Sequence, residues 1–146
     1  IGHSQGGLLT MIMGGLFNDV LDAIIPMSPA ILINTEAKEG KFFHEQVAEN
    51  GAYPRVLEMP DRKLSGNYLR AATLFSIEDL IIRFQGPVLL IHGNEDQSVP
   101  YEDSVKASKM YSNARLETIN EADHCYHGKV HEMVNALYPF LEEIIK

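Results

Sequence analysis

A serine, an aspartate and a histidine occur in this chain in an order that is typical of acyl-transfer enzymes. Ser4 lies in the segment Gly-His-Ser-Gln-Gly, residues 2–6, which fits the pattern G-x-S-x-G. In that pattern a sharp turn from a strand into a helix exposes the serine hydroxyl. Serine becomes a good nucleophile when a base takes its proton, and a histidine held by a carboxylate is suited to this. Asp96 and His124 follow in the sequence, so we expect Ser4 as nucleophile, His124 as base and Asp96 as its partner.

The backbone around Ser4 is expected to contribute as well. We expect that a Cβ at Gly2 or Gly6 would collide with the neighbouring strand or helix in so sharp a bend. The backbone N–H of Gln5 is expected to donate to the oxyanion. A second donor is expected from an N-terminal half of the fold that the 146 residues do not contain. Because losing such a donor costs roughly 3 kcal/mol of transition-state stabilisation, we expect these residues alone to be weakly active or inactive.

Other polar residues compete for these roles. Glu95 is an alternative to Asp96, although its longer side chain and earlier position make it the second choice. Asp123, beside the expected base, is interpreted as a turn-forming residue. Cys125 is interpreted as a small buried residue. His3 is expected to pack beside the serine or to line the cleft.

The remaining histidines give no metal site. His127 and His131 are one helical turn apart, but no third ligand is evident, and an exposed helix face is expected instead. We could assign no partner to His44 or His92. No metal and no other cofactor is therefore expected.

Apolar runs and helical patterns alternate along the chain. Strands are predicted at 23–27, 87–93 and 115–119, and helices at 8–17, 76–84, 101–111 and 127–145. Such alternation indicates an α/β fold, a mostly parallel sheet with helices on both faces. The carboxyl ends of parallel strands share one edge of a sheet, where such folds bind ligands. The three candidate catalytic residues follow strands and are expected to converge there.

Three details of these elements are less regular. Pro26 is awkward in a central strand, because it lacks a backbone donor. The glycines Gly14 and Gly15 are expected to weaken their helix, and Pro139 is expected to kink the last one. The strand at 115–119 alternates between apolar and polar residues, which indicates a position near an edge of the sheet.

Residues 31–75 are expected to be an insertion in a core formed by 1–30 and 76–146. One interpretation is a long, packed surface loop. The other is a lid over the serine, whose aromatic residues wall a pocket. These aromatic residues are Phe42, Phe43, Tyr53 and Tyr68.

Composition narrows the classes of partner. Twelve basic and 20 acidic residues give a net charge of −8, with the charges scattered along the chain. This charge argues against nucleic acid and against an anionic membrane as partners. The single cysteine excludes an internal disulfide and points weakly to a reducing, cytoplasmic compartment.

Several motifs together resemble the bacterial cinnamoyl or feruloyl esterases of the α/β-hydrolase superfamily, over essentially the whole chain. They are Gly2-His3-Ser4-Gln5-Gly6-Gly7, Ser28-Pro29-Ala30, Arg62-Lys63-Leu64, Gly66-Asn67-Tyr68-Leu69-Arg70, His92-Gly93-Asn94-Glu95-Asp96-Gln97-Ser98-Val99-Pro100 and Ala122-Asp123-His124-Cys125.

The resemblance implies a serine esterase that cleaves hydroxycinnamate esters through an acyl-enzyme, with the insertion as its lid. It also implies that Glu36 and Tyr68 approach the phenolic hydroxyl of a small aromatic ester, and that a homodimer forms in some relatives. The chain has no tryptophan, although lids of this group can carry one, and Met59 falls near that position. A peptidase or thioesterase of the same superfamily, and a fragment without activity, remain as alternatives.

Overall fold

The computed structural model describes residues 1–145, which divide into two compact units. The first unit combines residues 1–30 with the chain from Ile77 onward, and is called here the sheet unit. The second, Ile31–Ser76, is called here the inserted unit. Each unit has its own core and is described by itself.

The sheet unit is built on four parallel strands, which confirms the α/β prediction. Their order is β1 (Gly2–His3), β2 (Pro26–Met27), β7 (Val88–Gly93) and β8 (Ala114–Ile119). Every residue of β7 is buried, as expected for a strand covered on both faces. Strand β8 comes last in this order, and the burial of its residues alternates as the sequence predicts for a position near an edge.

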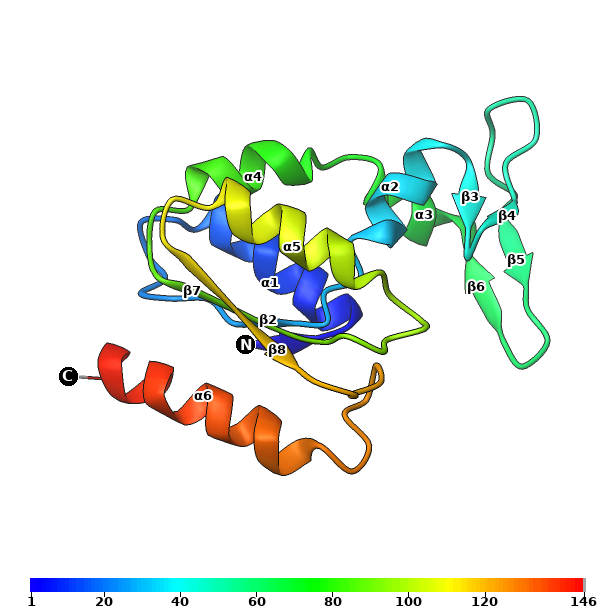
Figure 1. Ribbon diagram of the computed structural model, residues 1–146. Helices are drawn as coiled ribbons and strands as arrows, with labels where there is room; N and C mark the ends of the chain where they lie inside the picture. The colour runs from blue at the N-terminus through cyan, green and yellow to red at the C-terminus, as the bar shows by residue number, and fades with distance from the viewer. Residues whose placement is uncertain (146) are drawn as a thin grey trace. The chain divides into compact units, whose positions relative to one another are not determined.

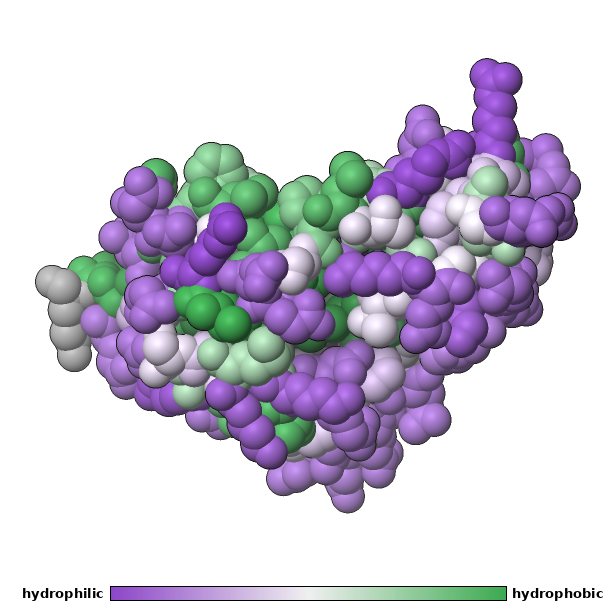
Figure 2. All heavy atoms as spheres, turned by 90° about the horizontal axis from the view of Figure 1, so that it is seen from above, coloured by the Kyte–Doolittle hydropathy of each residue, from purple (hydrophilic) through white to green (hydrophobic). Residues whose placement is uncertain are grey.

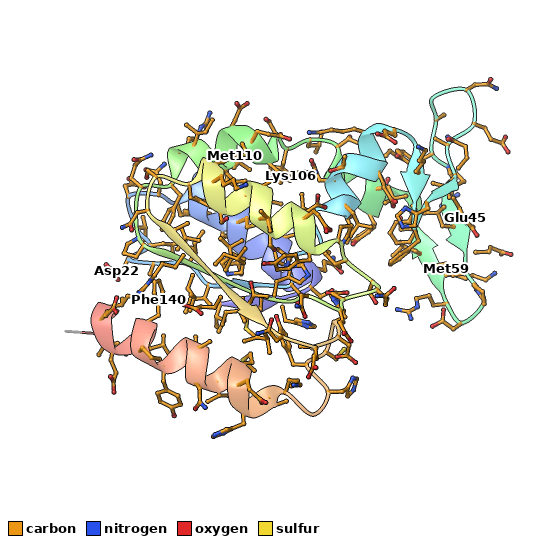
Figure 3. The ribbon with its side chains drawn as sticks, viewed as in Figure 1. Asp22, Glu45, Met59, Lys106, Met110 and Phe140 are labelled. Carbon is orange, nitrogen blue, oxygen red and sulfur yellow. The ribbon has the colours of Figure 1, made fainter. Side chains whose placement is uncertain are left out.

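Helices cover both faces of this sheet (Figure 1). Helices α1 (Gln5–Leu16), α4 (Ile77–Arg83) and α5 (Tyr101–Met110) lie on one face, and α6 (Val130–Ile144) on the other. The apolar side of α6 packs on a cluster that includes Ile25, Leu89 and Ile91, and its Phe140 points toward the sheet (Figure 3). Three layers therefore hold the strand ends in place.

The two glycines of α1 do not interrupt the helix, which runs from Gln5 to Leu16. A Cβ at Gly15 would lie 2.6 Å from the backbone oxygen of Leu80 in α4. A Cβ at Gly14 would lie 2.8 Å from the Ile24 side chain. These glycines allow close packing of α1 against α4 and the sheet, an effect that outweighs their low helix propensity.

Pro26 explains why the strand predicted at 23–27 is short. Its neighbours donate to β7, from Ile24 N–H to the Pro87 oxygen at 3.1 Å and from Ser28 N–H to the Ile91 oxygen at 2.8 Å. Pro26 has no N–H to donate between them, so the regular strand is only Pro26–Met27, with an isolated bridge at Ile24. The proline is nevertheless buried within the sheet.

The last helix begins later than predicted and continues past its proline. Residues His127 to Lys129 form a turn in which Gly128 has φ of 69°, so α6 begins at Val130. Pro139 lies inside α6, near its exposed side. It removes one donor from the helical hydrogen bonds without ending the helix.

The inserted unit contains two short helices and two antiparallel hairpins. The helices are α2 (Leu32–Lys38) and α3 (Gly66–Ala72), and the hairpins join β3 (Lys41–Phe42) to β4 (Glu45–Gln46) and β5 (Val56–Glu58) to β6 (Lys63–Ser65). Ala37, Leu57 and Leu69 form its buried core. Three of the four aromatic residues expected to wall a pocket, Phe42, Tyr53 and Tyr68, pack against this core.

On the face seen in Figure 2, hydrophilic residues prevail, and hydrophobic residues gather in patches between them. None of the helices within residues 1–145 combines the length and apolar character that crossing a bilayer requires.

Candidate active site

Ser4 occupies a strained turn between β1 and α1. Its backbone has φ of 59° and ψ of −121°, which non-glycine residues rarely adopt. Two backbone hydrogen bonds hold it there, from Ser4 N–H to the Met27 oxygen at 2.9 Å and from Ala30 N–H to the Ser4 oxygen at 3.0 Å. The turn leaves the serine hydroxyl at the end of the strands, as the motif predicts.

The glycines around this turn differ from the prediction in one respect. A Cβ at Gly2 would collide with the backbone oxygen of Gly6, as expected. A Cβ at Gly6 would meet no heavy atom within 4 Å, so the predicted collision there is wrong. The close approach occurs at Gly7, where a Cβ would lie 2.8 Å from the Met27 oxygen and 2.9 Å from Pro29 Cα. Gly7 therefore lets α1 start close against the end of β2.

The side chains of Ser4, His124 and Asp96 form one hydrogen-bonded series, called here the triad. His124 Nε2 lies 2.8 Å from Ser4 Oγ, and His124 Nδ1 lies 2.7 Å from Asp96 Oδ2. Each residue comes from a different strand end: the turn after β1, the loop after β7 and the loop after β8. The structure thus brings together the three residues that the sequence singled out. The aspartate can fix the proton of His124 on Nδ1, which leaves Nε2 free to accept from the serine.

The Asp96 carboxylate is fully buried and accepts hydrogen bonds at both oxygens. Its Oδ1 accepts from the backbone N–H groups of Ser98 at 2.8 Å and Val99 at 2.9 Å. Burial by itself would raise the pKa of Asp96, but the hydrogen bonds from His124, Val99 and Ser98 outweigh it and hold that pKa below its ordinary value. The carboxylate is therefore ionised at neutral pH.

Glu95 has no such environment. Glu95 is exposed, and its backbone N–H donates to the Ala122 oxygen at 3.1 Å. The preference for Asp96 over Glu95 agrees with this geometry.

The loop that carries His124 is tied down by its neighbours. Asp123 Oδ1 accepts from the backbone N–H groups of Cys125 and His127, both at 3.0 Å, as a turn-forming residue does. Tyr126 is buried, and its hydroxyl donates to the Ile91 oxygen at 3.0 Å. This tyrosine, which sequence reasoning missed, fixes the loop to β7.

Two further residues complete the support of this loop. Ser28 Oγ lies 2.8 Å from the Tyr126 hydroxyl, and His3 Nε2 lies 2.7 Å from the His124 carbonyl oxygen. The ring of His3 is 4.8 Å from that of His124. His3 thus packs beside the site, as expected.

Cys125 is exposed, so the prediction of a buried cysteine is wrong. Its side chain follows the turn outward, while the next residue, Tyr126, points into the core. His127 pairs with Asp123, with His127 Nδ1 at 2.7 Å from Asp123 Oδ2. Among residues 1–145 the structure places no three His, Cys, Asp or Glu side chains where they could hold a metal ion.

The expected oxyanion donor lies at the start of α1. Gln5 is the first residue of that helix, so no carbonyl of the preceding helical turn accepts its backbone N–H. The amino end of a helix also favours negative charge. The position suits stabilisation of an oxyanion formed beside Ser4.

His92 also belongs to this site, although sequence reasoning assigned it no partner. Its Nε2 lies 3.1 Å from Asp96 Oδ2 and its Nδ1 lies 2.7 Å from Ser104 Oγ. A sequence signal for this role exists. His92 lies within a buried strand, 4 positions before Asp96.

The proposed substrate-binding residues lie in the inserted unit. Glu36 is nearly buried, and its Oε1 lies 2.6 Å from Nδ1 of His44, which gives His44 a partner that the sequence did not reveal. Glu36 Oε2 is buried with no hydrogen-bond partner among the described residues. Tyr68 packs near Phe42, with 6.1 Å between ring centres, and burial raises the pKa of Tyr68. Their role in binding substrate stays a prediction.

One protein family and several solved structures are similar to this chain. The prolyl oligopeptidase family matches residues 1–146. Est1E from Butyrivibrio proteoclasticus, solved with ferulic acid bound, has a similar structure, with a TM-score of 0.92 and 39% sequence identity. That similarity covers 99% of this chain and 58% of the Est1E chain. No curated protein sequence is significantly similar to this chain.

More distant structures share the fold. An esterase domain from Rhodothermus marinus has a TM-score of 0.62 and 19% identity, covering 86% of this chain and 51% of its own. Alpha/beta hydrolase domain-containing protein 10 from mouse has a TM-score of 0.71 and 16% identity, covering 97% of this chain and 60% of its own. The resemblance inferred from the motifs is confirmed, and the chain belongs to the prolyl oligopeptidase family, within the α/β-hydrolase superfamily.

Proposed function

We propose that the protein to which this chain belongs is a serine hydrolase of carboxylic esters, and that it releases hydroxycinnamates such as ferulate. The observation that carries the proposal is the hydrogen-bonded triad, with Ser4 at a strained turn, 2.8 Å from His124. The choice of aromatic acid is supported by the 39% identity to Est1E, a protein solved with ferulic acid bound.

The reaction follows from the proton positions in the triad. Ser4 Oγ attacks the ester carbonyl carbon while His124 Nε2 takes the hydroxyl proton. The imidazolium that results carries a proton on both nitrogens, and the Asp96 carboxylate, 2.7 Å from Nδ1, stabilises its charge. The carbonyl oxygen becomes an oxyanion, to which the backbone N–H of Gln5 donates.

The tetrahedral intermediate then collapses. The bond from carbon to the alcohol oxygen breaks, and His124 gives its proton to the departing alcohol. Ser4 is left carrying the acyl group as an ester. His124 then takes a proton from water, whose oxygen attacks that ester. The bond from carbon to Ser4 Oγ breaks, His124 returns its proton to Ser4, and the carboxylic acid is released.

Peptide hydrolysis is the second candidate, because the family is named for a peptidase. The same triad serves amides, since an acyl-enzyme forms from either substrate. The triad therefore does not determine whether the leaving group is an alcohol or an amine. A comparison of substrates is needed to choose between ester and peptide.

The test compares methyl ferulate with a proline-containing peptide amide on the full-length protein. We expect hydrolysis of the ester at a kcat/KM at least tenfold above that of the amide, together with covalent labelling by a fluorophosphonate. Ser4→Ala should abolish both turnover and labelling. Preference for the amide would favour the peptidase, and labelling that survives Ser4→Ala would exclude Ser4 as the nucleophile.

A further inference from the structure

The acid of the triad receives a second imidazole, from His92 at the end of β7. His92 Nε2 lies 3.1 Å from Asp96 Oδ2, the same oxygen that accepts from His124 at 2.7 Å. The side chains of His92 and Asp96 are both 0% exposed. Water therefore does not reach this contact, and the two side chains depend on each other for hydrogen bonding.

The partners of His92 determine where its proton lies. A buried, ionised carboxylate can only accept, so Nε2 of His92 carries a hydrogen and donates it to Asp96. Burial lowers the pKa of His92, although the neighbouring Asp96 charge opposes this, so the ring is neutral at neutral pH. A neutral ring has no hydrogen left for Nδ1. Ser104 Oγ on α5, 2.7 Å away, therefore donates to Nδ1.

We infer that His92 is a positioning residue for the triad: with its Nδ1 bound by Ser104, it holds Asp96 Oδ2 toward His124 and shares the negative charge of that oxygen. This inference rests on the proposed function. A series of hydrogen bonds then runs from Ser104 on α5 through His92 to Asp96, which also accepts from His124.

Four donors meet the carboxylate. Two backbone N–H groups bind Oδ1, and the two imidazoles bind Oδ2. The backbone donors restrain one oxygen only, so rotation about that oxygen would still move Oδ2. The donor from His92 opposes this movement, because it gives Oδ2 a second hydrogen bond, from a fully buried side chain.

The other titratable groups near this series have different partners. Among the described residues, the only side chains that hydrogen bond to Asp96 are those of His92 and His124. The titratable groups beside the series on β1, α5 and the loop after β8 include His3, Tyr101, Asp103 and Tyr126. Asp123, in the same loop as His124, pairs with His127 instead. Asp103 pairs with Lys106 at 3.7 Å, and Tyr101 donates to or accepts from Thr118 at 2.6 Å.

Because two imidazoles share the negative charge of Asp96 Oδ2, removing one of them should change the other in a definite direction. A carboxylate oxygen with two strong donors attracts the proton of the His124 imidazolium less than one with a single donor. Loss of the His92 donor should therefore strengthen the attraction of Asp96 for that proton and favour the imidazolium form of His124. The acid limb of the kcat/KM profile, which follows the loss of the free base, should then move to higher pH.

Two amide substitutions at His92 separate this role from simple packing. In His92→Gln the side-chain nitrogen reaches the place of Nε2 and keeps the donor to Asp96. In His92→Asn the amide ends near the place of Nδ1 and loses it. On α5, Ser104→Ala removes the donor to His92 Nδ1. The matched control is Ser108→Ala, because the hydroxyl of Ser108 donates to the Val105 oxygen at 2.9 Å and not to the series.

The experiment measures methyl ferulate hydrolysis against pH in the full-length protein, and the NMR signal of the proton between His124 and Asp96 without substrate. We expect His92→Asn to lower kcat at least about tenfold and to raise the acid limb by about half a pH unit or more. His92→Gln should stay within about threefold of the wild type. Ser104→Ala should shift the limb in the same direction as His92→Asn, and Ser108→Ala should not.

Two results would overturn the inference. One is a His92→Asn variant with the kcat and the acid limb of the wild type. The other is an equal loss of kcat in both His92 variants with an unchanged acid limb and an unchanged NMR signal of the proton between His124 and Asp96. If His92→Asn does not fold, the comparison of Ser104→Ala with Ser108→Ala decides. If the wild type hydrolyses no substrate in a Ser4-dependent way, the proposed function fails, while the NMR signal of the proton between His124 and Asp96 still tests the role of His92.

Discussion

Asp96 and Glu95 are adjacent carboxylates whose surroundings differ completely. Asp96 is buried and accepts from His124 at 2.7 Å, whereas Glu95 is exposed. Neutralising Asp96 would favour the wrong tautomer of His124 and leave the imidazolium without a counter-charge. We expect Asp96→Asn to lower kcat on methyl ferulate by about 10³- to 10⁴-fold. Steady-state kinetics on the full-length protein measures this.

The neighbouring substitution supplies the control. Glu95→Gln removes a charge of the same sign from the same loop and should change kcat less than about twofold, because surface substitutions rarely matter. A larger loss in Glu95→Gln than in Asp96→Asn would assign the acid role to Glu95.

The buried His92 also predicts how stability depends on pH. Burial lowers its pKa against the opposing influence of Asp96, while the unfolded chain keeps a value of about 6.5. Below that value the unfolded state binds the proton more readily than the native state. The stability present above pH 6.5 is therefore lost progressively as the pH falls toward the native pKa.

This dependence can be isolated by substitution. His92→Gln cannot titrate, so its free energy of unfolding should fall less than that of the wild type between pH 7 and pH 5. Urea unfolding at several pH values measures the difference, with His131→Gln at an exposed position as control. If the free energy of unfolding falls equally with pH in His92→Gln and in the wild type, His92 binds its proton equally well in the native and the unfolded state, and the prediction is wrong.

At the scale of elements, the start of α1 depends on Gly7 and not on Gly6. A Cβ at Gly7 would press on backbone atoms at 2.8 and 2.9 Å, which cannot move without shifting β2 or α1. We expect Gly7→Ala to lower the free energy of unfolding by about 1–3 kcal/mol. Gly6→Ala places its Cβ in open space within the first turn of a helix, so it should cost nothing. Urea unfolding of both variants tests this, and equal losses would contradict the packing at Gly7.

The sequence predicted most elements of the sheet unit because its signals are local. The buried run at 87–93 and the alternating run at 115–119 became β7 and β8 with ends within a residue of the prediction. Strand β2 is shorter than the predicted strand at 23–27. Pro26 shortens it because its missing N–H would face β7. The partner of that N–H is set by the register with β7.

The triad was accessible from sequence for a similar reason. Each of its residues follows a strand in a short motif, and parallel strands bring their ends together. His92, Ser104 and Tyr126 were not found. The contacts of Ser104 with His92 and of Tyr126 with Ile91 cross 12 and 35 positions of sequence. His92 lies only 4 positions before Asp96, but their contact depends on how the loop between them folds. Burial of Tyr126 and exposure of Cys125 follow from the turn at Asp123, where a shift of one residue reverses which side chain points inward.

At the scale of the whole chain, the described residues contain two cores. The sheet unit buries Leu90 in β7, and the inserted unit buries Leu69 in α3, each with 0% of its surface exposed. The aromatic residues of the inserted unit serve its own packing, since Phe42, Tyr53 and Tyr68 contact the cluster of Ala37, Leu57 and Leu69. A short segment with a core of this kind can open and close as a cooperative unit.

A matched pair of leucine substitutions tests this separation. Leu69→Ala and Leu90→Ala each remove a fully buried side chain, and each should cost about 2–5 kcal/mol of local stability. Because each core is its own, Leu69→Ala should speed amide hydrogen exchange within Ile31–Ser76 and leave β7 and β8 protected. Leu90→Ala should speed exchange in the sheet unit. Exchange that rises equally in both units for either variant would show that the two cores unfold together, and that the inserted unit has no independent cooperativity.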